Sequence, residues 1–434
     1  MIKCLICGWT AAALAGGSAL AAEPGRVANY DESKAGGTPL PALLKTTGGE
    51  TVTSAEAWTK LRRPEIMEMF ERHVYGKTPP PAAWGRVEWK VIGVKRDALG
   101  GLATRKLVRV TLPDHPGWAG MEIMLHVPND AGKRVPCFVG LSFNGNHAVS
   151  DEPDIPISTR WMREDKAAGT VGNRATEQSR GRELGRWPMK MVLAEGFAVA
   201  TAYCGDIEPD HADGWKDGLR AALSPDGAKT VWQDGDWGAI GAWAWGLSRI
   251  ADYLETDTDI DAKRLAVIGH SRLGKTALWA GARDPRFGVV VSNESGEGGA
   301  ALMRRDFGET TAIITDKFPH WFAPGFSRYG ARPEDCPVDQ HMLIALVAPR
   351  SVYIASAVDD RWSDPMGEFL AGLNAEPVFA LFGLQGYGTT VQPPVGRSVG
   401  GAVGYHIREG KHDLTEFDWR MYLGFAKRRF GTGG

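Results

Sequence analysis

Short, largely apolar runs that recur along the chain limit its fold more than any other feature of the sequence. Each run has the length of a strand, and helical stretches such as 237–255 and 274–282 separate them. The runs cover residues 135–143, 197–203, 264–268, 288–292, 351–357 and 377–382. A strand that is apolar at every position is buried on both faces, and strands alternating with helices form parallel sheets. The pattern therefore predicts an α/β fold, a three-layer αβα sandwich around a mostly parallel central sheet.

Five further segments complete the predicted organisation. Residues 105–112 and 121–127 alternate apolar and polar side chains, as half-buried antiparallel strands do, and residues 55–75 carry apolar residues at helical spacing. Two long polar stretches, 148–188 and 205–235, interrupt the strand pattern. Because no linker or repeat accompanies them, we interpret these two stretches as surface insertions near the functional face and not as separate domains.

The N-terminal segment has the features of a secretory signal peptide. Residues 1–22 place Lys3 before an apolar run, and Ala19 and Ala21 put small residues where signal peptidase reads them. A buried N-terminal helix is the alternative, but the run is rich in Ala and Gly and has no cap. We therefore expect a secreted or periplasmic protein in which residues 23–434 form one domain.

Charge and cysteine content narrow the class of protein. The chain has 50 Lys and Arg against 52 Asp and Glu, a net charge of −2, and no polybasic run, so we expect no nucleic-acid partner. Beyond the leader, no run approaches the ~18 apolar residues of a membrane span. Cys137, Cys204 and Cys336 follow the leader and allow at most one disulfide. A soluble monomer that relies on its hydrophobic core is the expected result.

The segment RLAVIGHSRLGK, residues 264–275, is the strongest chemical signal. An apolar strand ends, Gly269 allows a tight turn, Ser271 stands at its tip and a helix begins at once. This is the pattern of a nucleophile elbow, which exposes a serine hydroxyl at a strained strand-to-helix turn. The usual G-x-S-x-G is here G-x-S-x-x-G, because Gly274 falls one place late. The alternative is a serine that only caps the following helix.

A serine nucleophile needs a histidine base, and that histidine needs an acid to fix its tautomer. His412 is the preferred base because it lies between the last strand and a terminal helix, and His406 is its rival. Glu294 follows the strand after the elbow, whereas Asp359 and Asp360 follow the next one. The order serine, acid, histidine is that of the α/β-hydrolases. The residues alone leave the choice of acid open.

The motifs together resemble those of the glucuronoyl esterases, carbohydrate esterase family 15. The resemblance covers roughly residues 135–430 and is specific, because Ser-Arg-x-Gly-Lys after a strand is not a general hydrolase motif. His270 stands where fungal members carry a disulfide-bonded Cys, so the chain is similar to the bacterial branch. The matching segments are FNGNH at 143–147, GDIEPD at 205–210, GHSRLGK at 269–275, SNESG at 292–296, DQHMLIALVAPR at 339–350 and GKHD at 410–413.

The resemblance implies a catalytic role for five residues. Ser271 would attack the C6 carbonyl of a glucuronate ester, with His412 as base and then acid. Glu294 would be the orienting acid, and Asp360 an auxiliary one found in some bacterial members. Arg272 would stabilise the anionic tetrahedral intermediate through its backbone N–H and its guanidinium.

Three further residues are implied as sugar contacts. Lys275, one helical turn after Ser271, would hydrogen-bond sugar hydroxyls, although such a lysine is otherwise read as a solvated helix residue. Glu309 would face the uronate ring, with a helix-cap carboxylate as the alternative. Trp362 would contact the uronate or its methoxy group, although a lone Trp more often belongs to the core.

Two other patterns carry less weight. Asn144, after a central strand, stands where hydrolases place a second oxyanion donor, or in a plain tight turn. The acids Asp206, Glu208 and Asp210 with His211 could share a metal, but they lack the Gly and terminal Glu of a calcium loop. We therefore expect no metal and no cofactor.

The sequence therefore predicts a secreted serine esterase of the α/β-hydrolase fold. Its expected substrates are esters of glucuronic or 4-O-methyl-glucuronic acid, such as those that join glucuronoxylan to lignin. The alternatives are an acetyl-xylan or other carbohydrate esterase on the same fold, and a non-catalytic carbohydrate-binding homologue.

Overall fold

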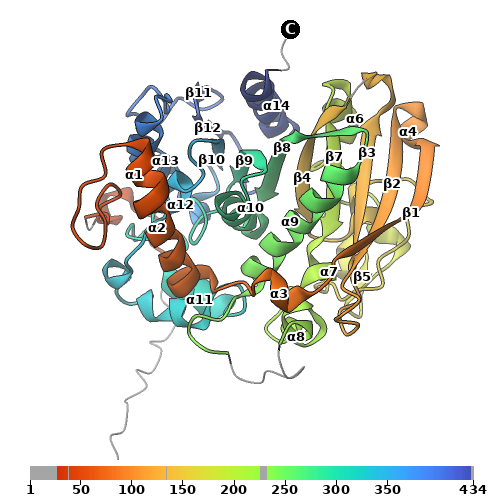
Figure 1. Ribbon diagram of the computed structural model, residues 1–434, viewed down its shortest axis with the longest axis horizontal. Helices are drawn as coiled ribbons and strands as arrows, with labels where there is room; N and C mark the ends of the chain where they lie inside the picture. The colour runs from red at the N-terminus through yellow and green to blue at the C-terminus, as the bar shows by residue number, and fades with distance from the viewer. Residues whose placement is uncertain (1–26, 38, 133, 225–231, 432–434) are drawn as a thin grey trace, which may run out of the picture.

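The alternating apolar runs and helices build one large sheet in the computed structural model (Figure 1). The structure describes residues 27–37, 39–132, 134–224 and 232–431. Within these residues the sheet has ten strands, and six neighbours, from β7 to β12, are parallel. The spatial order is β1 (Glu88–Asp97), β2 (Ala103–Thr111), β3 (Met121–Pro128), β7 (Ala198–Tyr203), β4 (Val135–Ser142), β8 (Ile260–His270), β9 (Phe287–Asn293), β10 (Ser351–Ala357), β12 (Val403–Arg408) and β11 (Ser398–Gly400).

Helices cover both faces of the sheet, which confirms the predicted three-layer α/β-hydrolase sandwich. Along β4, Val139 packs into a first hydrophobic cluster and Phe138 into a second, so each face of the sheet has its own core. Trp243 and Trp279 belong to the first cluster and Trp419 to the second, and all three are fully buried. The first cluster includes α9 (Ala239–Thr256), α10 (Arg272–Arg283), α12 (Gln340–Ala345) and α13 (Pro365–Leu381), and the second includes α6 (Met189–Ala194) and α14 (Glu416–Phe430).

One predicted strand is wrong. Residues 377–381 form the end of α13, with Pro377 inside the helix, and Phe382 is its C-cap, so no strand is present here. A short apolar run cannot be assigned by periodicity alone, and here the preceding residues already form a helix. The parallel sheet instead continues with β12, residues 403–408, which the prediction missed because His406 and Arg408 interrupt its apolar run.

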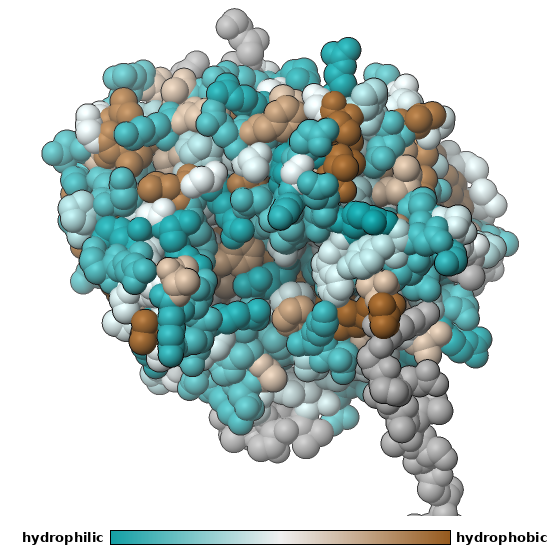
Figure 2. All heavy atoms as spheres, turned by 180° about the vertical axis from the view of Figure 1, so that it is seen from behind, coloured by the Kyte–Doolittle hydropathy of each residue, from teal (hydrophilic) through white to brown (hydrophobic). Residues whose placement is uncertain are grey.

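Several smaller features complete the description. Residues 55–75 are helical throughout, with two π-helical turns at Trp58–Arg62 and Glu71–Tyr75. The expected signal peptide lies outside the described residues. In the described ranges, no helix combines the length and the apolar character that a bilayer crossing requires. The face shown in Figure 2 is largely hydrophilic, with apolar residues in small groups. Cys137, Cys204 and Cys336 are buried free thiols.

Candidate active site

Ser271 stands at a sharp turn between the central strand β8 and the helix α10. Its backbone is in a left-handed conformation, with φ 57° and ψ −130°, and its N–H donates to the carbonyl of Asn293 on β9 (2.9 Å). The turn is so tight that only glycine fits at position 269. A Cβ there would stand 1.9 Å from the carbonyl oxygen of Leu273. A positive φ is strained for a residue with a side chain, and such strain is concentrated at functional sites. The first N–H groups of α10 have no acceptor within the helix and point toward this turn.

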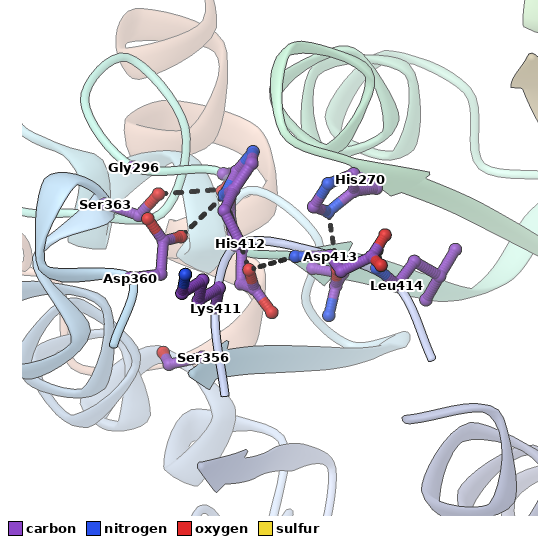
Figure 3. A network of polar contacts seen from close by, with 12 residues as sticks. His270, Gly296, Ser356, Asp360, Ser363, Lys411, His412, Asp413 and Leu414 are labelled. Carbon is purple, nitrogen blue, oxygen red and sulfur yellow. Dashed lines mark hydrogen bonds and ion pairs between the residues drawn. The ribbon is translucent and has the colours of Figure 1, made fainter. Parts of the chain in front are cut away.

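His412 lies in the loop between β12 and α14, beside Asp360 (Figure 3), and a second acid, Glu294, also contacts it. Its Nδ1 is 2.6 Å from Oδ2 of Asp360 and 3.3 Å from Oε2 of Glu294. Both acids are almost fully buried, whereas 38% of the His412 side chain is exposed. Asp360 follows β10 and Glu294 follows β9, so the ends of neighbouring parallel strands bring these groups together. The shorter contact is to Asp360, although the prediction names Glu294 as the orienting acid and Asp360 as the auxiliary one.

Glu294 is held mainly by Arg408, a residue that the sequence analysis did not single out. Nη2 of Arg408 donates to Oε1 of Glu294 (2.5 Å), and its Nε donates to Asp418 (2.9 Å). The same guanidinium donates to the carbonyls of Lys411 (3.1 Å) and Asp413 (2.5 Å), which flank His412. Arg408 therefore ties one acid to the loop that carries the histidine. The sequence analysis missed Arg408 because β12 was not predicted, so nothing placed this arginine at the end of a strand beside the histidine loop.

The three titratable groups shift one another's pKa values. Burial alone would lower the pKa of His412, but hydrogen bonds to Asp360 and Glu294 outweigh it and raise that pKa to about 9. Burial would raise the pKa of Asp360, yet its contact with His412 holds that pKa below the usual value. Burial raises the pKa of Glu294 to about 7, against the opposing effect of His412 and Arg408.

Ser271 and His412 both line a cavity of about 320 Å³. Arg272 lies on its wall, and the polar stretch 148–188, which we predicted to be an insertion, contributes Trp161 and Arg163, among others. The cavity therefore has a nucleophile, a histidine and cationic donors around one space. This is the arrangement in which a serine hydrolase binds an ester and stabilises an oxyanion.

Two other residues of the cavity wall have fixed orientations. His270 packs against His412 with the two rings tilted by 39° and their centroids 4.4 Å apart, and its Nδ1 is 2.6 Å from Oδ1 of Asn293. Burial lowers the pKa of His270 well below its usual value, so its imidazole is neutral. Asn144 also lines the cavity, and its side-chain amide donates to the buried Glu183.

Comparison with known proteins identifies the family. A family model described as "Glucuronyl esterase, fungi" matches residues 230–383. Carbohydrate esterase MZ0003, from an unknown prokaryotic organism, is 46% identical over 407 residues, which cover 94% of this chain and 93% of that protein. The chain belongs to the glucuronoyl esterases, carbohydrate esterase family 15. It is accordingly a carboxylic ester hydrolase, and the non-catalytic alternative is set aside.

Solved structures support the same assignment. "Glucuronoyl Esterase from Solibacter usitatus" is 48% identical, with a TM-score of 0.86, over 92% of this chain and 100% of that one. A promiscuous CE15 esterase from the marine bacterial metagenome is 44% identical, also with a TM-score of 0.86, over 93% of this chain and 100% of that one.

The three predicted sugar contacts are not among the residues that line the cavity, although Lys275 contacts the ring of Trp321, as Arg272 does. Among the described residues, none of Lys275, Glu309 and Trp362 belongs to the cavity wall. Lys275 is buried, donates to the carbonyl of Ser295 (2.5 Å) and pairs with Glu309 (3.4 Å). The N–H of Glu309 donates to the carbonyl of Trp362 (2.8 Å), so the three residues form one connected group.

The structure separates the alternatives that the sequence left open. His406 is fully buried on β12, and its Nε2 is 2.8 Å from Asp418, so it does not share the cavity with Ser271. Of the acids of the GDIEPD segment, Glu208 pairs with Arg220 (2.6 Å) and Asp210 with Arg272 (2.8 Å). Within the described ranges, the one group with the spacing of metal ligands is Glu294, Asp360 and His412, which is the site itself.

Proposed function

We propose that this chain hydrolyses esters of glucuronic acid or its 4-O-methyl ether, such as the cross-links between glucuronoxylan and lignin. The observation that carries the proposal is the strained Ser271 in one cavity with His412, whose Nδ1 is held by Asp360. Membership of the glucuronoyl esterase family supports glucuronate as the acyl group of the ester.

In the proposed mechanism, Ser271 attacks the ester carbonyl while His412 takes its proton. Because Nδ1 of His412 is engaged by Asp360, Nε2 is the nitrogen left for that proton. The tetrahedral intermediate carries a negative charge, which Arg272 stabilises. His412 then protonates the leaving alcohol, and water hydrolyses the acyl-enzyme by the same steps. Asp360 and Glu294 together stabilise the imidazolium form of His412.

The uronate ring would be held by Lys275, Glu309 and Trp362, a group whose hydroxyl-binding capacity comes from the ammonium and the carboxylate. Secretion is proposed from residues 1–22 and is tested separately, by finding the N-terminus of the exported protein after residue 22.

The test is release of benzyl alcohol from the benzyl ester of glucuronic acid, with p-nitrophenyl acetate assayed beside it. We expect turnover of the uronate ester to exceed that of acetate, and Ser271→Ala to lower it by at least about 10³-fold. An untouched uronate ester with cleaved acetate would refute the substrate but not the hydrolase. Undiminished activity of Ser271→Ala would refute the nucleophile.

A broader carbohydrate esterase, including acetyl-xylan esterase, is the second candidate. It is favoured by the pairing of Lys275 with Glu309, neither of which lines the cavity, and by the likeness to an esterase described as promiscuous. Lys275→Met distinguishes the two. A loss on the uronate ester alone supports the first candidate, and equal losses on both esters support the second.

A further inference from the structure

The guanidinium of Arg272 is held on three sides in the cavity wall. Its Cζ lies 4.4 Å from the ring centroid of Phe143 and 5.8 Å from that of Trp321. Its Nε is 2.8 Å from Oδ2 of Asp210. Among the described residues, its two terminal nitrogens have no hydrogen-bond partner or ion pair, so they are free to meet a group in the cavity. An arginine side chain has many rotamers, and fixing one of them costs entropy that the surrounding contacts must offset.

Asp210 is itself fixed by donors on both of its oxygens. Oδ1 accepts from Nε1 of Trp321 (2.7 Å) and from Nε2 of His320 (2.9 Å). Oδ2 faces Arg272 and, at 3.4 Å, Nη2 of Arg163. The carboxylate is nearly buried and therefore cannot rotate without breaking at least one of these contacts. Such full satisfaction is what makes a buried charge tolerable.

The donors also keep Asp210 ionised. Burial alone would raise the pKa of Asp210, but the charge of Arg272 and the hydrogen bonds from His320 and Trp321 hold it well below the usual value. The carboxylate is therefore an anion at every pH at which an esterase works. The two other acids of the same segment do not pair with Arg272. Asp206 accepts from the N–H of Glu122, and Glu208 pairs with Arg220.

We propose that Asp210 is a positioning residue for the esterase reaction: it orients the Arg272 guanidinium so that its terminal N–H groups meet the oxyanion. The proposal rests on the proposed role of Arg272. It assigns a function to the insertion 205–235, which supplies the anchor for a residue on the central helix α10. A displacement of about 1 Å at a reacting centre can cost about 10²-fold in rate, so such an anchor matters.

A purely electrostatic role would have the opposite sign. A carboxylate beside Arg272 partly neutralises the charge that stabilises the oxyanion. If neutralisation were its main effect, removing the negative charge would raise kcat. If positioning dominates, the same change lowers kcat because Arg272 gains freedom.

A double-mutant cycle decides between these roles. The variants are Asp210→Asn, Arg272→Met and the pair, assayed with both benzyl glucuronate and p-nitrophenyl acetate. We expect Asp210→Asn to lower kcat about 10- to 100-fold with KM changed less than about threefold. In the Arg272→Met background the same substitution should change kcat less than about threefold, because Asp210 acts through Arg272. Asp210→Glu should recover part of the loss.

Two results would overturn the proposal: an equal loss in both backgrounds, or a kcat of Asp210→Asn at or above that of the parent. Asp213→Asn, an exposed acid in the same insertion paired with Lys216, is the matched control and should leave kcat unchanged. If Asp210→Asn does not fold, Trp321→Phe removes one donor to Asp210 and should give a smaller loss with the same dependence on Arg272. If the enzyme does not hydrolyse the uronate ester, the same double-mutant cycle can still be evaluated with p-nitrophenyl acetate.

Discussion

The two halves of the site are built in different ways. The Ser271 half is local: a strand, a turn and a helix within 260–283 fix the backbone conformation of the serine. The His412 half is assembled over long distances, since Glu294, Asp360 and Arg408 reach the histidine loop from three different strands. The local half depends on backbone sterics, whereas the distant half depends on buried charges. Substitutions in the Ser271 half should therefore act through steric clashes with the backbone, and substitutions in the His412 half through loss of charge pairing.

Gly269→Ala should give the largest effect, because it breaks the local half sterically. The added Cβ would lie 1.9 Å from the carbonyl oxygen of Leu273, a backbone atom that cannot move without displacing α10. We expect activity to be lost and the free energy of unfolding to fall by about 3 kcal/mol or more. Ester hydrolysis and urea denaturation measure the two effects.

Gly117→Ala is the matched control, since its Cβ would have no neighbour within 4 Å. It should leave activity and unfolding free energy unchanged within about 0.5 kcal/mol. An active, stable Gly269→Ala would show that the turn tolerates a side chain and that the local half is less constrained than described.

Asp360→Asn should have the next largest effect, because it removes the closer of the two acids from His412. We expect kcat to fall by about 10²–10⁴-fold, the range of general acid–base catalysis, and Glu294→Gln to cost less. The asymmetry reflects the contacts of 2.6 Å and 3.3 Å. A larger loss for Glu294→Gln would restore Glu294 as the principal orienting acid.

The same contrast explains what could be predicted from the sequence. The elbow is predictable because Gly269 and Ser271 lie only two residues apart in one short segment. His412 was readable from its place before the last helix, although the strand before it was misplaced at 377–382. Arg408 was not, because a buried arginine between two acids has no local signature. The order of Glu294 and Asp360 depends on side-chain distances that no spacing in the sequence encodes.

Arg408→Gln should test the charge network of the distant half. It leaves Glu294 and Asp418 buried without their cation, so we expect the free energy of unfolding to fall by about 3–5 kcal/mol. Urea denaturation measures the change. Arg420→Gln, which breaks an exposed pair with Glu416, should cost only about 0.3–0.5 kcal/mol. Equal losses for the two variants would mean that the buried pairs contribute no more than a surface contact.

The pH dependence of kcat/KM should show the smallest effect, but it tests most directly whether buried charges control the His412 half. Hydrogen bonds to Asp360 and Glu294 raise the pKa of His412 to about 9, and only the neutral imidazole can accept the proton of Ser271. Activity should therefore rise with pH, with a midpoint well above the ordinary histidine pKa of about 6.5. Asp360→Asn removes one negative partner, so it should move the midpoint down by about one unit, equivalent to about 1.4 kcal/mol. Rates from pH 5 to 10 with the uncharged benzyl ester measure both midpoints. Coincident midpoints would mean that Asp360 orients His412 without stabilising its charge, because a carboxylate that favours the imidazolium must shift its titration.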